Sequence, residues 1–530
     1  MKFSAALAWS LIGCSPEPER SDGPGEPTAD SPAPTGPTGP TGDTATTGVD
    51  AGVSLAFVHD PSGYSPLAGE LTATAQVPVT VELRVPGDHG AASDVTYVTP
   101  TAATDHVVPV LGLYPDRTQQ VEVVVRDATG GVVHEQTFSV TTPPLSEAVH
   151  DDIEVSVADF DQMTPGFTLV SAFGRGYGHG ANPQRPMMFD AFGDVRWTLS
   201  FVGHPQLSGL FYDVGMERLA NGNLYFGDSS TAAIYEVDML GRVIDTWPID
   251  PYDFHHNVQE LANGNFLVTG SLRGADTVED QVLEIDRTTK EILNTWDLRQ
   301  SLDPTRDTWS GQLYDWAHVN AVQEDPVDDT IVISGRTQGV VKLTRDNEVV
   351  WILAPHVDWD TAGDGTDLST KLLQPLDAAG EPITDPAVLR GQSAHPDFDW
   401  NWTQHAVQVV GGGDIAIFDN GVDRNFQGAG PYSRAVRFHV DDVAMTVQQV
   451  WEYGESRGAT MYSEIVSDVD VLPNGHVIWS PGAVATDAGP YGAVIELDAD
   501  DEVVFEARIW STGPTFGITF HRTERLTLYP

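Results

Sequence analysis

The stretch from Asp315 to Arg336, DWAHVNAVQEDPVDDTIVISGR, carries side chains that could bind a small oxyanion. Its segments AVQ and TIVIS are typical of short strands, and the acidic turn DPVDD between them favours chain reversal. His318 and Arg336 each stand nine residues from the turn centre at Val327. An antiparallel hairpin would therefore bring both to its open end. Asn320 follows His318 by two residues and is expected on the same strand face.

An imidazole, a guanidinium and an amide at one hairpin mouth suit a small tetrahedral oxyanion. Arginine supplies a fixed fork of donors, and histidine can move a proton near neutral pH. Two sister hairpins repeat the pattern, because His256, Asn320 and His405 each stand two residues before the valine of a VQ pair. A lone histidine near a strand start is usually structural. Recurrence at matched positions, with Arg336 on the returning strand, favours one shared ligand site.

From about Ile153 the chain repeats two kinds of hairpin. The first kind has a small polar turn, as in VQELANGNFLVTG, and the second closes on an aromatic residue, as in AIYEVDMLGRVIDTW. Six hairpins of the second kind occur, five of them after a clear first hairpin and one after FTLVSAF. This pattern predicts an all-β fold, a six-bladed β-propeller over residues 150–530. The spacing of the closing aromatics doubles between Trp351 and Trp451, which indicates an insertion at about 356–400.

Three segments precede the predicted propeller. Residues 51–146 contain about seven short alternating segments, which indicate a small immunoglobulin-like or fibronectin III-like β-sandwich. Residues 15–50 are a tether rich in Pro, Gly and Thr that cannot form a core. Residues 1–14 resemble a bacterial lipoprotein signal with its lipobox, in which Cys14 would be acylated. An ordinary cleaved signal with an incidental cysteine is the alternative.

The lipobox pattern predicts an exported protein, either periplasmic or at the cell surface. The apolar run before Cys14 is too short to span a bilayer, so the membrane is expected to hold the chain only through this lipid anchor. Cys14 is the only cysteine, which excludes an internal disulfide. A net charge of −50 makes nucleic acid an unsuitable partner. The oligomeric state stays open, with a homodimer possible.

Four segments resemble motifs of the bacterial arylsulfate sulfotransferases: YDWAHVNAVQEDPVDDTIVISGRTQ, FHHNVQELANGNFLV, TQHAVQVVGGGDIAIFDNG and FHRTERLTLYP. The resemblance implies transfer of a sulfuryl group from an aryl sulfate donor to a phenol acceptor, without 3′-phosphoadenylyl sulfate or another cofactor. It also implies a covalent sulfohistidine, with His405 as the nucleophile. By the same resemblance His256, Asn320 and Arg336 would hold the sulfuryl oxygens. His318 would assist proton transfer.

The implied chemistry suits these residue types. A neutral imidazole nitrogen is a competent nucleophile near pH 7, and a sulfated nitrogen is a good leaving group. Tyr212 approaches the same mouth by alignment of the repeats and either lines the phenol pocket or belongs to the core. The FDWNW run before His405 either stacks the acceptor ring or packs under the insertion. His255 is expected on the opposite strand face from His256, in a packing role.

Two rival functions use the same residues. Several histidines at a propeller mouth could hold zinc or copper and make a metalloenzyme. A fixed cation such as Arg336 repels a second cation, so no metal ligand is predicted. A propeller lipoprotein that only binds an anion or another ligand is the other alternative.

Overall fold

The computed structural model describes residues 51–145, 151–174, 185–210, 215–306, 313–422, 424, 430–487, 490–511 and 518–530. The predicted lipoprotein signal, Cys14 and the tether up to residue 50 lie outside these residues. Among the residues described, no helix is long and apolar enough to cross a membrane.

The N-terminal domain is all-β, and its described part has six strands where about seven were expected. The difference lies in β2, a long strand that pairs with β1 and β4 through its first half and with β3 and β5 through its second. Alternate residues of β5 are buried, as a strand with one face on a core requires. The strands are β1 (Ser54–His59), β2 (Gly69–Val85), β3 (Val95–Val98), β4 (Ala103–Val110), β5 (Arg117–Asp127) and β6 (Val132–Thr142), with a 3-10 turn at Gly90–Ser93.

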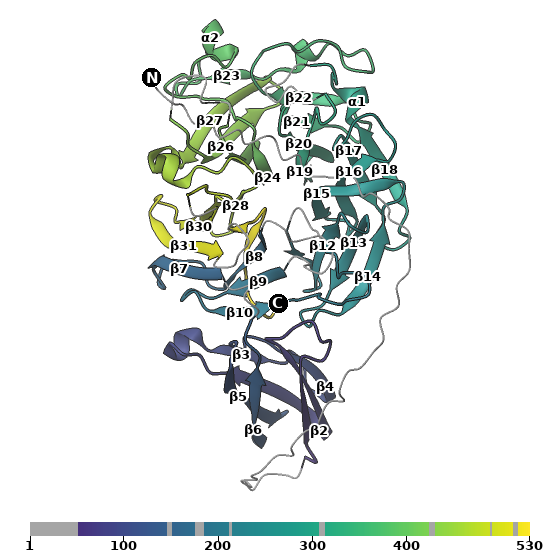
Figure 1. Cartoon of the computed structure of the whole chain (residues 1–530), viewed down its shortest axis with the longest axis vertical. Helices are drawn as coiled ribbons and strands as arrows, with labels where there is room; N and C mark the ends of the chain where they lie inside the picture. The colour runs from purple at the N-terminus through teal and green to yellow at the C-terminus, as the bar shows by residue number, and fades with distance from the viewer. Residues whose placement is uncertain are drawn as a thin grey trace. The chain divides into compact units, whose positions relative to one another are not determined.

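Within the described residues, six further sheets of four or five strands follow (Figure 1). All six aromatic-closing hairpins and all five polar-turn hairpins predicted from the sequence are present. The first three sheets contain β8 (Phe167–Gly174), β9 (Arg185–Phe189) and β10 (Val195–Thr198) with β32 (Ile518–Thr519) and β33 (Thr523–Leu526); β11 (Glu217–Arg218), β12 (Leu224–Asp228), β13 (Ala233–Val237) and β14 (Val243–Pro248); and β15 (Tyr252–Glu260), β16 (Phe266–Leu272), β17 (Gln281–Ile285) and β18 (Ile292–Asp297).

The other three sheets have the same sequential pairing. Two of them gain a fifth strand at the outer edge. They contain β19 (Val319–Asp325), β20 (Thr330–Gly335), β21 (Gly339–Leu343) and β22 (Val349–Leu353); β24 (His405–Gly411), β25 (Asp414–Asp419), β26 (Arg434–Asp441) and β27 (Thr446–Tyr453) with β23 (Gln374–Leu376); and β28 (Asp468–Val471), β29 (Val477–Ser480), β30 (Gly492–Leu497) and β31 (Val503–Ser511) with β7 (Asp151–Ala158).

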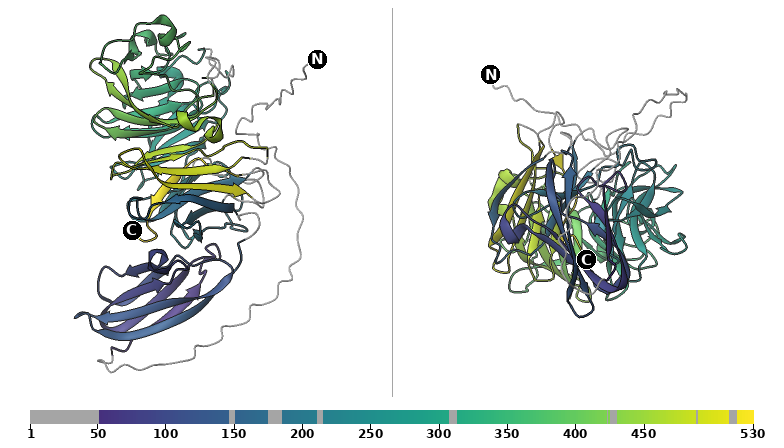
Figure 2. Two further views of the ribbon diagram at one scale, coloured as in Figure 1. Left: turned by 90° about the vertical axis from the view of Figure 1, so that its left-hand side faces the viewer. Right: turned by 90° about the horizontal axis from the view of Figure 1, so that it is seen from below.

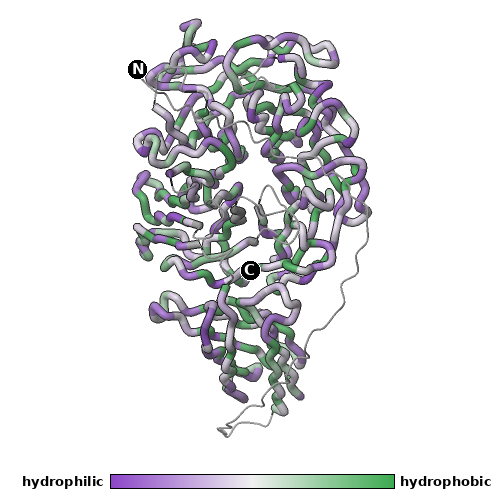
Figure 3. The backbone as a smooth tube through the Cα atoms, in the orientation of Figure 1, coloured by the Kyte–Doolittle hydropathy of each residue, from purple (hydrophilic) through white to green (hydrophobic). Residues whose placement is uncertain are grey.

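Apolar clusters lie between consecutive sheets. One cluster joins the second and third sheets, others join the third to the fourth, the fourth to the fifth and the fifth to the sixth, and another joins the sixth to the first. The middle strands β13, β17 and β21 are buried along their whole length because both sheet faces are covered. Figure 3 shows hydrophobic strand segments and hydrophilic segments at many of the connecting turns.

Three of the recurring tryptophans bind each of the first three sheets to the next one. The indole Nε1 of Trp197 donates to the carbonyl of Met239, and that of Trp296 donates to the carbonyl of Thr344, both at 2.8 Å. Trp247 makes the same contact with the turn of the third sheet. A buried indole needs a partner for its N–H, and the neighbouring turn supplies a carbonyl.

The two ends of this region share sheets. The N-terminal strand β7 pairs with β31 in the sixth sheet, and β32 and β33 pair with β8 in the first (Figure 2). Between β22 and β24 the predicted insertion contributes β23, a 3-10 turn at Leu368–Lys371 and the short helix α2 (Pro386–Leu389). Elsewhere the described residues include the short helix α1 (Leu298–Ser301) and a 3-10 segment at Glu455–Met461.

We expect Trp296→Phe to lower the free energy of unfolding by about 2 kcal/mol, because it leaves space in a packed cluster and a buried carbonyl without its donor. Trp451→Phe is the matched control. Trp451 is only half-buried and donates to the exposed Asp501, so its loss should cost less than about 1 kcal/mol. Urea denaturation measures both, and equal costs would contradict the role given to the buried indole.

Candidate active site

Three of the predicted histidines lie at the starts of neighbouring inner strands. His256 lies in β15, His318 directly precedes β19 and His405 begins β24. These strands contact one another in that order (Figure 1). The ring centroids of His256 and His318 are 4.8 Å apart, and those of His256 and His405 are 6.4 Å apart. All three side chains are buried, so distant parts of the sequence form one imidazole cluster.

Residues with left-handed backbone angles occur at or next to the clustered histidines. The φ angle is +57° at His256, +46° at His318 and +49° at Ala406. The pairing register of β15, β19 and β24 shifts at the same places. Such bulges re-aim side chains and are common next to active sites. The bulges, rather than plain strand alternation, therefore direct the imidazoles into the cluster.

The expectation that His255 points away from His256 is wrong. Nε2 of His255 lies 3.0 Å from Oε1 of Glu279, and Nε2 of His256 lies 3.1 Å from Oε2 of the same carboxylate. Strand alternation holds only for extended backbone, and the left-handed φ of His256 breaks it. His255 therefore belongs to the cluster.

Two carboxylates that the sequence analysis did not single out hold His318. Its Nδ1 is 2.6 Å from Oδ2 of Asp315 and 3.0 Å from Oε2 of Glu279. Its Nε2 is 3.2 Å from Nε2 of His256. Asp315 stands within the DWAH motif and could have been found by its spacing. Glu279 comes from the loop between β16 and β17, and no sequence pattern connects it to the histidines.

Arg336 returns to His318, as the hairpin count predicts. The backbone N–H of Arg336 donates to the carbonyl of His318 at 3.0 Å. Its guanidinium makes one long contact, 3.4 Å from Nη2 to the carbonyl of Glu464. Its Nε has no hydrogen-bond partner among the described residues. The guanidinium thus keeps donors for an anionic ligand.

Asn320 connects the fourth and fifth sheets. Its Nδ2 donates to the carbonyl of Gln404 at 2.8 Å, directly before His405. Its buried Oδ1 finds no partner in the part of the chain that the structure describes. One N–H of the amide is therefore already used, and the other could reach a ligand.

Asn420 determines which nitrogen of His405 carries the proton. Oδ1 of Asn420 is 2.8 Å from Nδ1 of His405, and its Nδ2 donates to the carbonyls of Ser463 at 2.9 Å and Val466 at 3.2 Å. Because Nδ2 already faces two acceptors, Oδ1 must accept from an Nδ1–H of His405. Nε2 of a neutral His405 then carries the lone pair.

Burial lowers the pKa of His405 well below the usual histidine range, since a buried ring loses the hydration that stabilises its charge. Repulsion from Arg336, His521 and His256 lowers this pKa further, against the opposing effect of the hydrogen bond to Asn420. His521 stands in the motif FHRTERLTLYP, but no role was expected for it. His405 is consequently a neutral imidazole in a site of positive charge.

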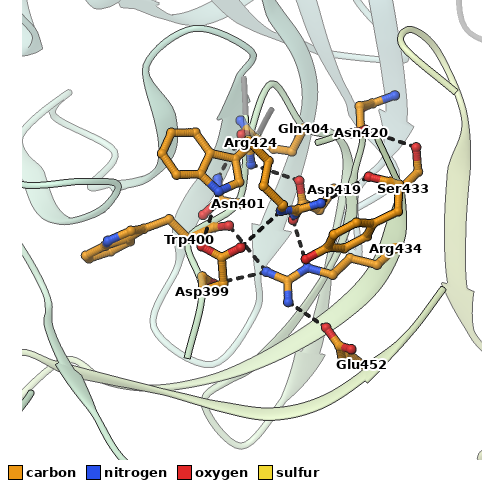
Figure 4. A network of polar contacts seen from close by, with 12 residues as sticks. Asp399, Trp400, Asn401, Gln404, Asp419, Asn420, Arg424, Ser433, Arg434 and Glu452 are labelled. Carbon is orange, nitrogen blue, oxygen red and sulfur yellow. Dashed lines mark hydrogen bonds and ion pairs between the residues drawn. The ribbon is translucent and has the colours of Figure 1, made fainter. Parts of the chain in front are cut away.

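A buried ion-pair network holds the strand that carries Asn420 (Figure 4). Asp419 pairs with Arg424 and, at 2.9 Å, with Nε of Arg434. Arg424 also pairs with Asp399 at 3.0 Å, and Arg434 pairs with Glu452 at 2.6 Å. Breaking one partner of a buried pair costs about 3–5 kcal/mol. The network thus ties the end of the insertion to β25 and β26 beside His405.

Of the aromatic candidates, Tyr212 lies outside the described residues. Phe398, Trp400 and Trp402 of the FDWNW run are buried in the apolar cluster between the fourth and fifth sheets. The run therefore packs under the insertion and does not offer a free ring to an acceptor.

A cavity of about 370 Å³ lies near the cluster, but its lining does not suit an anion. Glu217, Asp468, Asp470 and Glu524 line it, and of its two lining arginines Arg522 pairs with Asp468 and Arg525 with Glu496. Burial and mutual repulsion raise the pKa of Asp470 and of Glu524 well above the usual range. The imidazoles and the guanidinium of Arg336 suit an anion better than this lining does.

The donor atoms of His255, His256 and Glu279 lie close enough to surround a cation, as do those of Glu279, Asp315 and His318. In both groups the short contacts join imidazole nitrogens to carboxylate oxygens. Ion pairing accounts for this geometry, so we assign these residues to hydrogen bonding.

Known proteins match most of the chain. A family model described as arylsulfotransferase matches residues 153–515, and one described as the arylsulfotransferase Ig-like domain matches residues 56–143. An arylsulfate sulfotransferase of Escherichia coli is 30% identical, covering 82% of this chain and 85% of its own. An arylsulfate sulfotransferase of Lelliottia amnigena is 28% identical, over 79% of this chain and 83% of its own.

We expect the ring of His405 to stay neutral as the pH falls through the ordinary histidine pKa of about 6.5, because its pKa lies well below that value. Because folding lowers its pKa, this ring adds stability above about pH 6.5 that is lost as the pH falls. Histidine NMR titration tests the expectation, with His405→Gln to identify the signal. A midpoint near 6.5 would contradict it.

Proposed function

Since the chain belongs to the arylsulfotransferase family, we propose that it moves a sulfuryl group from a phenolic sulfate ester to an acceptor phenol without a nucleotide donor, through a sulfated His405. The family model and the two relatives support an enzyme of aryl sulfuryl transfer. The observation that carries the finer proposal is the neutral His405, with its Nε2 lone pair fixed by Asn420, close to Arg336.

In the first step Nε2 of His405 attacks sulfur. An N–S bond forms, the S–O bond to the donor ring breaks, and the phenolate leaves with the electron pair. His318 donates a proton to the oxygen of the leaving phenolate. The proton on Nδ1 stays between His405 and Asn420, so the sulfated ring is cationic and a good leaving group.

In the second step the acceptor phenol attacks the same sulfur. Its proton passes to His318, the new S–O bond forms, and the electron pair of the N–S bond returns to Nε2 of His405. The SO3 unit spreads negative charge over three oxygens while it transfers. Arg336, Asn320 and the histidines offer donors already in place, and such preorganised donors stabilise charge that develops in a transition state.

We infer that this site lies at one mouth of a closed six-bladed β-propeller. Six sheets with sequential pairing support this inference, together with the apolar cluster that joins the sixth sheet to the first. The pairing of β7 with β31 and of β33 with β8 supports it as well, because the chain ends then fasten neighbouring blades.

We expect His405→Ala to abolish release of nitrophenolate from p-nitrophenyl sulfate in the presence of a phenol, because no other imidazole takes its place. The wild type should carry acid-labile sulfate on His405 after donor alone, and the variant should not. His476→Ala is the control, since His476 pairs with Glu496 near a peripheral turn. Wild-type turnover by His405→Ala would refute the nucleophile assignment.

We expect Arg336→Ala to lower kcat by about 10²-fold, the usual loss when one preorganised donor to a developing oxyanion is removed. Arg336→Lys should restore part of the rate, because it returns the charge without the fork. Arg345→Ala provides the comparison, since Arg345 pairs with Glu284, Glu324 and Asp329 on the outside of the sheets. Equal rates for the wild type and Arg336→Ala would remove Arg336 from the site.

A further inference from the structure

One buried carboxylate, that of Glu279, collects three imidazole nitrogens. Its oxygens lie 3.0 Å from Nε2 of His255, 3.1 Å from Nε2 of His256 and 3.0 Å from Nδ1 of His318. Only 4% of the Glu279 side chain is exposed, so water does not replace these partners.

The loop between β16 and β17 holds this carboxylate in a defined place. The backbone N–H of Glu279 donates to Oγ of Ser271 at 2.9 Å, and its carbonyl accepts from the backbone N–H of Val319 at 3.0 Å. Its φ of +54° is unfavourable for a side chain with a Cβ and costs about 1 kcal/mol or more. A conformation of this kind persists only where surrounding contacts determine it.

Glu279 is ionised in this environment. Burial alone would raise its pKa, but the charges of His255 and His318 and the hydrogen bonds from His255 and His256 outweigh burial and hold the pKa well below the usual range. An ionised carboxylate only accepts hydrogen bonds. Each of the three facing nitrogens must therefore carry a proton.

We propose that Glu279 is the positioning residue of the site, whose carboxylate fixes the protonated nitrogen of His255, His256 and His318 and so leaves Nε2 of His318, which lies 3.2 Å from Nε2 of His256, as the nitrogen that takes up and releases a proton. The proposal rests on the proposed sulfuryl transfer and adds to it a residue outside every recognised motif. The cluster then has two parts. His255, His256 and His318 face the carboxylate of Glu279, whereas His405 faces the amide of Asn420.

Other charged groups face the same imidazoles. Asp315 is a second acceptor for Nδ1 of His318, but no contact joins it to His255 or His256 among the described residues. The ring of His521 lies 5.6 Å from that of His256. Arg336 adds a fixed positive charge that acts on His405. Glu279 is thus the one carboxylate in the described part of the site that contacts all three rings.

The test is the pH dependence of turnover in Glu279→Gln. A glutamine amide has one acceptor oxygen and one donor group, so it cannot accept from three N–H groups, and at least one ring must change its tautomer. We expect kcat/KM for p-nitrophenyl sulfate to fall between about 10-fold and 10⁴-fold, the upper figure being the loss that a wrong histidine tautomer causes in a serine protease.

The pH profile of kcat/KM should also shift toward lower pH in Glu279→Gln. A nearby negative charge favours protonated imidazole, so its removal should shift the basic limb of the profile toward lower pH. Glu279→Asp keeps the charge and should restore the position of the limb, with part of the rate. Glu236→Gln is the control, because Glu236 is equally buried but pairs with Arg287 away from the histidines. It should leave the profile unchanged.

A second measurement needs no turnover. In ¹⁵N NMR spectra of the wild type we expect a proton on Nε2 of His255 and His256 and on Nδ1 of His318, and a change at one or more of these in Glu279→Gln. The opposite tautomers in the wild type would overturn the proposal even if the variant failed to fold. An unchanged pH profile and unchanged NMR signals in a folded Glu279→Gln would also overturn it.

The two proposals fail in different ways. If the wild type transfers no sulfuryl group but shows the expected tautomers and their change, the role of Glu279 stands and the proposed reaction falls. If the wild type is active and Glu279→Gln keeps the same profile and signals, the reaction stands and the role of Glu279 falls.

Discussion

The whole site depends on a backbone constraint, the left-handed φ angles at the entrances of the inner strands. His256, His318, Ala406 and Glu279 all adopt positive φ without being glycine. Each such residue costs about 1–3 kcal/mol, which the sheets around it must offset. The regular hydrogen bonding of β15, β19 and β24 resumes directly after the bulges. The paired parts of the sheets thus hold these residues in an unfavourable conformation. The imidazoles converge because these positions cannot relax into regular strand.

The local charge around the imidazoles differs in sign from the net charge of the chain. A net charge of −50 repels a sulfate ester at long range. Within the cluster, Arg336 and the imidazoles stand beside only a few carboxylates, and these are already bound to ring N–H groups. Four carboxylates gather in the neighbouring cavity, where Asp468 pairs with Arg522. Charges of opposite sign are therefore separated inside one fold over a short distance.

Much of the architecture could be predicted from the sequence because turns and closing tryptophans recur. Tight polar turns fix hairpin register, and the register set by the DPVDD turn brings His318 opposite Arg336. The prediction failed where the backbone departs from an extended strand, as at His255. It also missed Glu279, Asn420 and His521. Contacts of Glu279 join residues from separate loops, and such pairings follow from the packed sheets rather than from any spacing along the chain.

The shared sheets at the chain ends have a consequence for assembly. Strand β31 pairs with β7 across about 350 residues of sequence, and β33 returns to β8. Contacts this distant along the chain form late, because a long loop must close before any pairing rewards it. The first and sixth sheets cannot be completed while the C-terminus is still being synthesised. The edges of the first and sixth sheets are therefore expected to form after the hairpins that lie between them.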